Sequence, residues 1–550
     1  MNPMDYLYPA LILLVFIAVV LGVFRAQRRE LARLRENFGK IPEGNGLEME
    51  SVRGYFDAVR DGNAPEIDDI TWNDLEMDEV YRRVNACCTS VGEAYLYAML
   101  RRPLFDTAKL VERENAIAWF EREKDMRFLV QRTLMSLGRQ NANGLAGLMW
   151  ETRSASGFRF ARLFRVLSVL PVLSALLFFI STPLAVGAML GFATINCLVY
   201  IYQKARMDAK FITLRSLTAF LGCAKILCGK KYAALPQAKA IRKNFAPFST
   251  VAGKLKSTFF TQRMGGELQP VMDLFKMIVL YDVVRYDRAL ETVEMNKAEF
   301  RALFEAVGEV DACIGILSFR LSLPKYCLPE FCEKNEVRFT EIYHPLLSDP
   351  VTNSGVIARG SIVTGSNASG KSTFIKTLAI NGIFAETIHT CCGSGFKTRL
   401  SLVLTSMALR DSIRNGESYF VAEIKSVRRI LEALTRFPCV LYMDEILRGT
   451  NTPERIAASV AVLRHIAKSK TVCVIASHDI ELTELMKNEY DCYSFSERVA
   501  DTGVTFDYKL QNGAAKTRNA IKLLSLMGVD EKIVAEAERL VESGVGNGEA

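Results

Sequence analysis

The sequence predicts an α/β domain with a parallel sheet, preceded by a mostly helical region and about three transmembrane helices. Three observations lead to this fold class. A glycine-rich loop joins a strand-like run, 361–364, to a helix-like run, 373–379. Residues 6–24 and 166–203 contain no charged side chain. Residues 207–320 have helical hydrophobic periodicity and few helix breakers, so we expect long helices there.

The glycine-rich loop has the spacing of a phosphate-binding loop. It matches the pattern G-x-x-x-x-G-K-[ST], in the strand-to-helix context that the pattern requires. Backbone N–H groups and a helix N-terminus cradle phosphate in such a loop, so we expect a nucleotide here rather than a chance glycine turn. Lys371 should reach the β- and γ-phosphates, and Ser372 should bind Mg²⁺. The expected nucleotide-binding residues are Gly365, Ser366, Asn367, Ala368, Ser369, Gly370, Lys371, Ser372 and Thr373.

Two further strand-like runs end in polar residues. The apolar run 440–443 leads directly to Asp444 and Glu445, and "TVCVIASHD" leads to His478. Continuous apolar runs are typical of buried parallel strands, whose carboxyl ends meet at the ligand-binding edge of an open sheet. Asp444 is expected to hold Mg²⁺ and Glu445 to orient and deprotonate the attacking water. A histidine at a strand end is usually structural, but here we expect His478 to contact the γ-phosphate.

The order of four segments carries a family resemblance. After the loop come "DSIRNGESYFVAEIKSVRRIL" (411–431), "LYMDEILRGTNTPERIAAS" (441–459) and "VIASHDIELTEL" (474–485). This order resembles the MutS family of DNA mismatch repair ATPases. The resemblance implies that the chain hydrolyses ATP with Mg²⁺, forms a homodimer and binds DNA. It also implies that Gly416 and Ser418 act across the dimer, on the γ-phosphate held by the partner subunit.

The resemblance extends beyond these motifs, over most of 70–150 and 300–541. Further matching segments are "YHPLL" (343–347), "EAVGEVDACIGILSF" (305–319) and "TSVGEAYLYAMLRRPLFDTAKLVERENAI" (89–117). Mismatch readers of the family carry an N-terminal domain with a Phe-x-Glu that wedges into the duplex. The residues that precede the core-like region contain no Phe-x-Glu, so direct reading of a mismatch is not expected.

The first apolar stretch, 6–24, is long enough to span a bilayer as a helix. The start "MNPMD" is acidic and lacks the basic beginning of a secretory signal, so we expect an uncleaved anchor. Arg25, Arg28 and Arg29 follow directly and place that side of the membrane in the cytoplasm.

The second apolar stretch, 166–203, is too long for one pass, since a single helix of this length would measure about 57 Å. A break at 181–183 favours two short passes, and a buried core hairpin is the alternative. Basic residues flank both ends, so both ends are expected in the cytoplasm. We therefore expect a multi-pass protein of the cell (inner or plasma) membrane, with its ATPase domain in the cytoplasm.

Composition adds one candidate binding surface. The net charge is +8, and a basic stretch lies within 230–256. It is expected either to contact phosphates of nucleic acid or anionic lipid, or to be a solvated helical face. The 13 cysteines contain no C-x-x-C pair and are expected to be packing thiols in a reducing compartment. The candidate contacts in the basic stretch are Lys230, Lys231, Arg242 and Lys243.

Together these features predict a membrane-anchored, dimeric, MutS-like ATPase that acts on DNA. Two alternatives remain. One is a nucleotide-gated membrane scaffold for a protein or lipid partner. The other is an ABC transporter ATPase, but the segment "RNGES" differs from the signature that is usual in such ATPases. The expected domains are an anchor (1–24), a basic helix and linker (25–69), a first core part (70–165), the hairpin (166–203), a helical lever (204–335) and the ABC-type, MutS-like ATPase domain (336–550).

Overall fold

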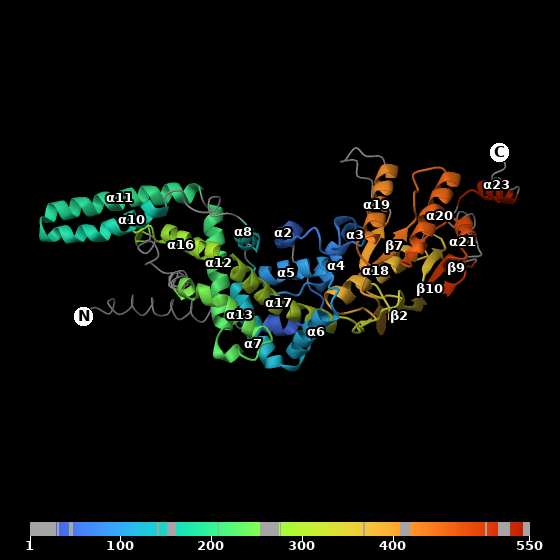
Figure 1. Cartoon of the computed structure of the whole chain (residues 1–550), viewed down its shortest axis with the longest axis horizontal. Coiled ribbons are helices and arrows are strands. Elements are labelled where there is room, and N and C mark those ends of the chain that lie inside the picture. The colour runs from blue at the N-terminus through green and yellow to red at the C-terminus, as the bar shows by residue number, and fades with distance from the viewer. Residues whose placement is uncertain are drawn as a thin grey trace, which may run out of the picture. The chain divides into compact units, whose positions relative to one another are not determined.

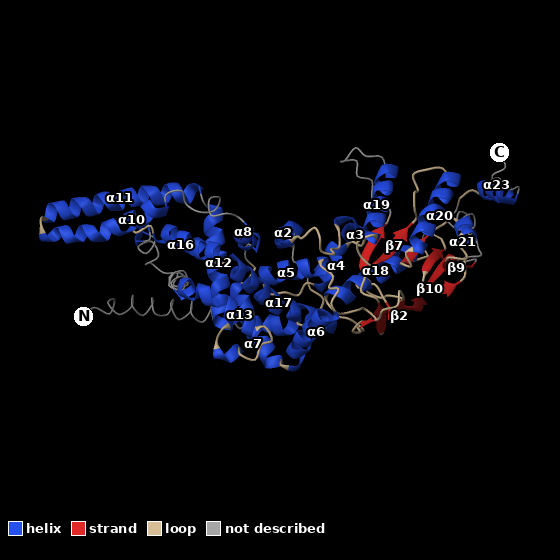
Figure 2. Cartoon of the chain, viewed as in Figure 1, coloured by secondary structure: helices blue, strands red, loops and turns tan. Residues whose placement is uncertain are grey.

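The computed structural model describes residues 29, 32–42, 48–139, 142–150, 161–206, 208–253, 274–275, 277–366, 369–407, 419–500, 503–514 and 529–542. The chain forms two compact units (Figures 1 and 2). Unit 1 consists of 1–60, 84–98 and 115–322, and unit 2 of 61–83, 99–114 and 323–550. Unit 2 thus takes two stretches from the part of the sequence expected to form linker and helical core.

Unit 2 is built on a six-stranded sheet with strand order β10-β9-β4-β8-β7-β6. All neighbours are parallel except β10, which pairs antiparallel with β9 at one edge. Strands β4, β7 and β8 consist almost entirely of buried residues, as expected for parallel strands covered on both faces. The strands are β4 (Gly360–Thr364), β6 (Leu402–Ser406), β7 (Cys439–Asp444), β8 (Val472–Ala476), β9 (Tyr490–Ala500) and β10 (Gly503–Asn512).

The helices of unit 2 follow the strands in an alternating α/β pattern. The helix after β4 packs against β6, β7 and β8. The helix after β7 begins at an Asn451 cap, whose side chain accepts a hydrogen bond from the backbone of Glu454, with a proline in its first turn. These helices are α18 (Lys371–Thr387), α19 (Tyr419–Leu434), α20 (Thr452–Lys468), α21 (Ile480–Leu485) and α23 (Glu531–Glu542).

A second, smaller sheet has the order β1-β5-β2-β3. Its strands are β1 (Glu330–Phe331), β2 (Val337–Ile342), β3 (Asn353–Ile357) and β5 (Gly395–Thr398). The short helix α3 (Asp69–Asp74) packs on β6: the Asp74 carboxylate accepts hydrogen bonds from Thr405 Oγ1 at 2.7 Å and from the Met407 amide at 3.0 Å. These contacts explain why 61–83 belongs to unit 2.

Unit 1 is helical in its described residues. Its central helix, α17 (Lys297–Leu321), is buried along most of its length. The Cα of Gly92 lies so close to this helix that an added Cβ would be 2.2 Å from Asp311 Oδ2. Its other helices are α2 (Met49–Val59), α7 (Lys124–Leu137), α8 (Ala142–Trp150), α12 (Asp208–Leu227), α13 (Ala238–Phe245), α16 (Tyr281–Met295), η2 (Lys230–Tyr232) and η3 (Ala246–Phe248). Helices α4 (Met77–Val84), α5 (Ser90–Arg101) and α6 (Thr107–Arg122) contribute residues to both units.

An apolar hairpin extends from unit 1. It consists of α10 (Ala161–Leu173), the 3₁₀ turn η1 (Ser174–Phe179) and α11 (Thr182–Arg206), which pack together as an antiparallel pair (Figure 1). Two segments, 162–179 and 182–202, are long and apolar enough to cross a membrane, and few of their residues are buried by protein. This exposure is unlike the buried core hairpin weighed as the alternative. The expected span at 6–24 lies outside the described residues.

Candidate functional site

The loop after β4 closes on the side chain of its own lysine. Lys371 is almost completely buried, and its Nζ donates hydrogen bonds to the carbonyls of Gly365 and Ser366, both at 2.7 Å. Gly365 and Gly370 have φ angles of +140° and +96°, which side-chain-bearing residues rarely adopt. An added Cβ on Gly365 would be 2.7 Å from the carbonyl oxygen of Phe495. The loop therefore needs glycine at both positions.

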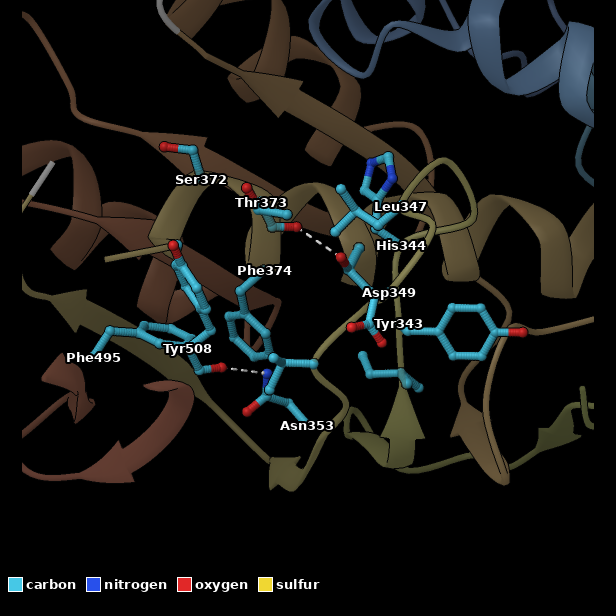
Figure 3. A pocket seen from close by; sticks show the side chains of 14 residues that line it. Tyr343, His344, Leu347, Asp349, Asn353, Ser372, Thr373, Phe374, Phe495 and Tyr508 are labelled. Carbon is cyan, nitrogen blue, oxygen red and sulfur yellow. Dashed lines mark hydrogen bonds between the residues drawn. The ribbon is translucent and has the colours of Figure 1, made fainter. Parts of the chain in front are cut away.

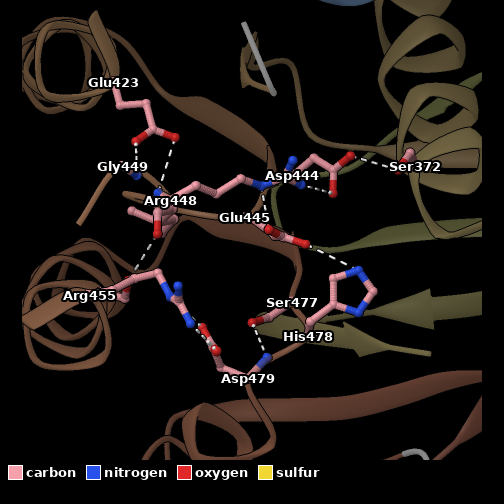
Figure 4. A network of polar contacts seen from close by, with 12 residues as sticks. Ser372, Glu423, Asp444, Glu445, Arg448, Gly449, Arg455, Ser477, His478 and Asp479 are labelled. Carbon is pink, nitrogen blue, oxygen red and sulfur yellow. Dashed lines mark hydrogen bonds and ion pairs between the residues drawn. The ribbon is translucent and has the colours of Figure 1, made fainter. Parts of the chain in front are cut away.

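The first turn of α18 contacts the end of β7. Ser372 Oγ donates a hydrogen bond of 2.6 Å to Asp444 Oδ2 (Figure 4). A hydroxyl and a carboxylate are hard oxygen ligands of the kind that Mg²⁺ prefers, usually one or two from protein with the rest from phosphate and water. No group of three or more His, Cys, Asp or Glu that could hold a metal occurs among the described residues. The pair therefore fits a Mg²⁺ that is shared with a nucleotide and does not fit a metal held by protein alone.

Glu445 lies one residue beyond β7 in the left-handed region, with φ +57°. Its amide donates to the carbonyl of Ala476 at 3.0 Å, which fixes the backbone against the end of β8. A non-glycine residue held in this conformation costs about 1–3 kcal/mol, and such strain clusters at functional sites. The backbone conformation of Glu445 therefore helps to set the direction of its carboxylate, together with the side-chain rotamer.

Two basic side chains hold the Glu445 carboxylate. His478 Nε2 lies 3.2 Å from Oε1, and the Arg448 guanidinium pairs with Oε2 (Figure 4). Burial, with a contribution from nearby Lys371, lowers the pKa of His478. The imidazole is therefore neutral at neutral pH, and because an ionised carboxylate only accepts hydrogen bonds, Nε2 carries the proton.

Further side chains fix Arg448 and His478 in place. The Glu423 carboxylate accepts from the amides of Arg448 and Gly449, each at 3.2 Å. Asp479, next to His478, is bound by two nitrogens of Arg455 at 2.7 and 3.1 Å. Sequence reasoning assigned no role to Arg448 or Glu423. Arg448 could have been suspected from its place four residues after Asp444, whereas Glu423 gives no local signal.

A cavity of about 480 Å³ adjoins the loop (Figure 3). It is bounded by the start of α18, at Gly370 and Thr373, and by the aromatic rings of Phe495 and Tyr508. Asn353 Nδ2 donates to the Tyr508 carbonyl at 3.0 Å, which links β10 to β3. Sequence reasoning did not single out this aromatic wall.

His344 also lines this cavity, within the quoted "YHPLL" segment. Burial lowers its pKa to about 4, with a further contribution from Lys376, so the ring is neutral at physiological pH. The wall therefore offers flat, uncharged surfaces next to the loop.

The structure brings part of the expected site together. Strands β4, β8 and β7 are consecutive in the sheet, so Lys371, Ser372, Asp444, Glu445 and His478 converge at one edge. Asn367, Ala368, Gly416 and Ser418 lie outside the described residues.

The basic candidates lie in unit 1. Lys230 and Lys231 lie in η2, and Arg242 and Lys243 lie on α13. Arg242 donates to the carbonyls of Cys228 and Gly229 at 3.2 and 3.3 Å, so it also stabilises the end of α12. The two lysines of η2 are exposed.

The fold and this site define a class: α/β proteins in which a glycine-rich loop opens a helix at the edge of a parallel sheet. Comparison with known proteins shows which family the segment carrying this site resembles. The family model of MutS domain V matches residues 361–543. This segment is therefore similar to the MutS family, and the resemblance predicted from the sequence is confirmed for this part of the chain.

Two curated relatives are similar in sequence to about a third of the chain. The DNA mismatch repair protein MutS of Aquifex pyrophilus is 29% identical over 176 residues, which are 31% of this chain and 20% of the relative. The DNA mismatch repair protein MutS of Methanothrix thermoacetophila is 29% identical over 174 residues, again 31% and 20% of the two chains. The matched segment thus spans about a fifth of the length of these relatives.

Proposed function

We propose that unit 2 binds and hydrolyses ATP with Mg²⁺. The observation that carries this proposal is the convergence of three strand ends. The loop lysine, the Ser372–Asp444 pair and the Glu445–His478 pair all lie at the carboxyl edge of β4, β7 and β8. Phosphate binding, metal ligation and activation of water each need one of these groups, and ligands of open α/β sheets bind at this edge.

Nucleotide binding would exchange hydrogen bonds of the loop. Lys371 Nζ, now shared between the Gly365 and Ser366 carbonyls, would turn to the phosphates. Ser372 and Asp444 would hold Mg²⁺, whose charge neutralises that of the phosphates. The adjoining cavity, with its aromatic wall and neutral His344, is of a size and polarity that suit the adenine base.

Glu445 is the proposed base for the attacking water. As it lies, one carboxylate oxygen pairs with Arg448 and the other faces His478. The Arg448 guanidinium thus occupies Oε2, the carboxylate oxygen that does not face His478. We therefore expect Arg448 to move away from Glu445 when the site is fully assembled, leaving Oε2 to accept the proton of the attacking water.

The second part of the proposal is insertion of the hairpin into a bilayer. Its exposed apolar side chains run along both arms, from Val166 and Val172 on one arm to Leu190 and Leu198 on the other. The apolar part of α11, 182–203, would measure about 33 Å, close to the thickness of a hydrocarbon core. Location in the cell membrane, with unit 2 in the cytoplasm, follows from the basic residues flanking the hairpin.

DNA binding and dimerisation are proposed from the family. The relatives are named as DNA mismatch repair proteins, and the matched segment includes 416–418, the expected contact across a dimer. If this contact acts in trans, mixing a Lys371→Ala chain with a Ser418→Ala chain should restore part of the activity, because one composite site keeps both groups. No rescue in dimers shown to be mixed would contradict a shared site.

DNA-stimulated ATP turnover by the purified full chain tests the proposal that this ATPase acts on DNA. Added duplex should raise the rate, with a matched and a mismatched duplex acting alike. Lys371→Ala is the control, since its basal and stimulated rates should both vanish. Turnover that ignores DNA, yet requires Lys371, would favour the alternative of a nucleotide-gated membrane scaffold.

A further inference from the structure

A second cavity, of about 780 Å³, lies in unit 1 at the base of the apolar hairpin. It is lined by α10, by α16 and the residues just before it, and by the residues that follow η3. Its lining is amphipathic, and the residues that matter here are Arg165, Arg285, Arg288, Val251, Val279 and Met295.

The charged part of the lining is basic. Three arginines face one carboxylate, Glu291. Arg165 pairs with both Glu291 and the buried Asp287. Arg285 lies over the ring of Tyr281, 4.0 Å from its centroid, and Arg288 is exposed. Arg285 and Arg288 thus place two further guanidinium groups on the wall of the cavity, and guanidinium groups bind phosphate through paired hydrogen bonds.

The apolar part of the lining indicates which class of phosphate-containing molecule fits the cavity. A nucleic-acid backbone or a free phosphate needs cationic and polar partners, whereas a phospholipid also brings glycerol and acyl carbons. Val251, Val279 and Met295 provide apolar surface beside the arginines.

The position of the cavity at the base of the hairpin also favours a phospholipid. Arg165 lines the cavity, and the adjacent Val166 is 57% exposed on the first turn of the apolar arm. Tyr202, which is 55% exposed, lies near the end of the other arm, and tyrosine is enriched where a helix leaves the hydrocarbon core. If the hairpin spans the bilayer, the arginines lie at the level of the headgroups.

We infer that this cavity binds the headgroup of an anionic phospholipid, with Arg285 and Arg288 on its phosphate. This inference rests on the proposed insertion of the hairpin into a membrane. A bound lipid would fix the depth of the hairpin. It would also contact α16, which leads through Asn296 directly into the buried central helix α17. Membrane charge would thereby stabilise the core of unit 1.

The test compares two charge-matched variants of the full chain. Arg285→Gln with Arg288→Gln removes the inferred contacts, whereas Arg122→Gln with Arg132→Gln removes the same charge from two exposed positions of unit 1, outside the cavity lining. Each protein is purified in neutral detergent and titrated with phosphatidylglycerol or phosphatidylcholine, and thermal unfolding is followed. We expect phosphatidylglycerol to stabilise wild type and the Arg122/Arg132 control variant, and its apparent affinity to fall about tenfold or more in the Arg285/Arg288 variant.

Three results would overturn the inference. They are equal stabilisation by the two lipids, an Arg285/Arg288 variant that responds like wild type, and an effect reproduced by inorganic phosphate or by a DNA duplex at the same charge concentration. Arg285→Lys with Arg288→Lys keeps the charge and should retain most of the response, which separates lost binding from misfolding. Failure of the hairpin proposal is distinct, because a chain without residues 1–24 would then be extracted from membranes by alkaline carbonate.

Discussion

Ser372 Oγ lies 2.6 Å from Asp444 Oδ2, so the first turn of the loop helix and the end of β7 meet at one point. This contact joins residues that are 72 positions apart in the sequence. It places the hydroxyl and the carboxylate where both could bind one metal ion.

Asp444→Asn should weaken nucleotide binding only when Mg²⁺ is present. The amide keeps the shape of the side chain but removes the negative charge that favours the cation. We expect the affinity for Mg²⁺-ATP to fall about tenfold or more, while the affinity measured with EDTA changes little. Ser372→Ala should act in the same direction. Equal loss with and without Mg²⁺ would instead indicate damage to the fold.

Gly92→Ala should destabilise unit 1. The new Cβ would be 2.2 Å from Asp311 Oδ2, and that carboxylate cannot retreat without losing hydrogen bonds from Thr89 Oγ1 at 2.6 Å and the Thr89 amide at 2.8 Å. We expect a loss of about 2–3 kcal/mol in the free energy of unfolding. The matched control is Gly222→Ala on α12, where an added Cβ meets nothing within 4 Å. It should be neutral or stabilise by up to about 1 kcal/mol.

The stability of unit 1 should decrease between pH 6 and 7. Burial raises the pKa of Glu93 to about 7, although Arg139 Nε lies 3.1 Å from its carboxylate. The folded state thus holds this proton more tightly than the unfolded state. The stabilisation is complete below the ordinary glutamate pKa and is lost as the pH rises through about 7.

Glu93→Gln should remove this slope, which for one group is at most about 1.4 kcal/mol per pH unit. Burial also raises the pKa of Asp311, to about 6, so a decline at lower pH should persist in the variant. Thermal unfolding at several pH values measures the effect, with exposed Glu36→Gln as the control. A slope that survives in Glu93→Gln would assign the titration to another group.

The hairpin should hold the protein in membranes without the N-terminal apolar stretch. Deletion of residues 1–24 leaves 162–179 and 182–202 intact, and each carries a predominantly apolar surface. We expect the shortened chain to resist extraction by alkaline carbonate. Adding Val172→Lys and Leu190→Lys, on exposed positions of the two arms, should release it because a charge in the hydrocarbon core is costly. Extraction of the deletion variant alone would contradict insertion of the hairpin.

Local patterns predicted the parts of the site that lie next to strand ends. A glycine-rich loop or an acidic pair after an apolar run identifies itself, because the strand, the turn and the polar residue are adjacent in sequence. Glu423 and the aromatic wall at Tyr508 were missed because their roles depend on contacts between distant segments. The inclusion of 61–83 in unit 2 was missed for the same reason. The contacts of Asp74 with β6 join distant segments, and helical periodicity does not indicate them.

Hydrolysis by Glu445→Gln tests the central claim most directly. The purified variant should bind Mg²⁺-ATP with nearly wild-type affinity, because the carboxylate contacts His478 and Arg448 and the phosphate-binding loop is unchanged. Its steady-state turnover should fall at least about a hundredfold, as expected when a general base is lost. Lys371→Ala, in contrast, should lose binding itself. Wild-type turnover in Glu445→Gln, with ATP bound, would contradict the account of this site.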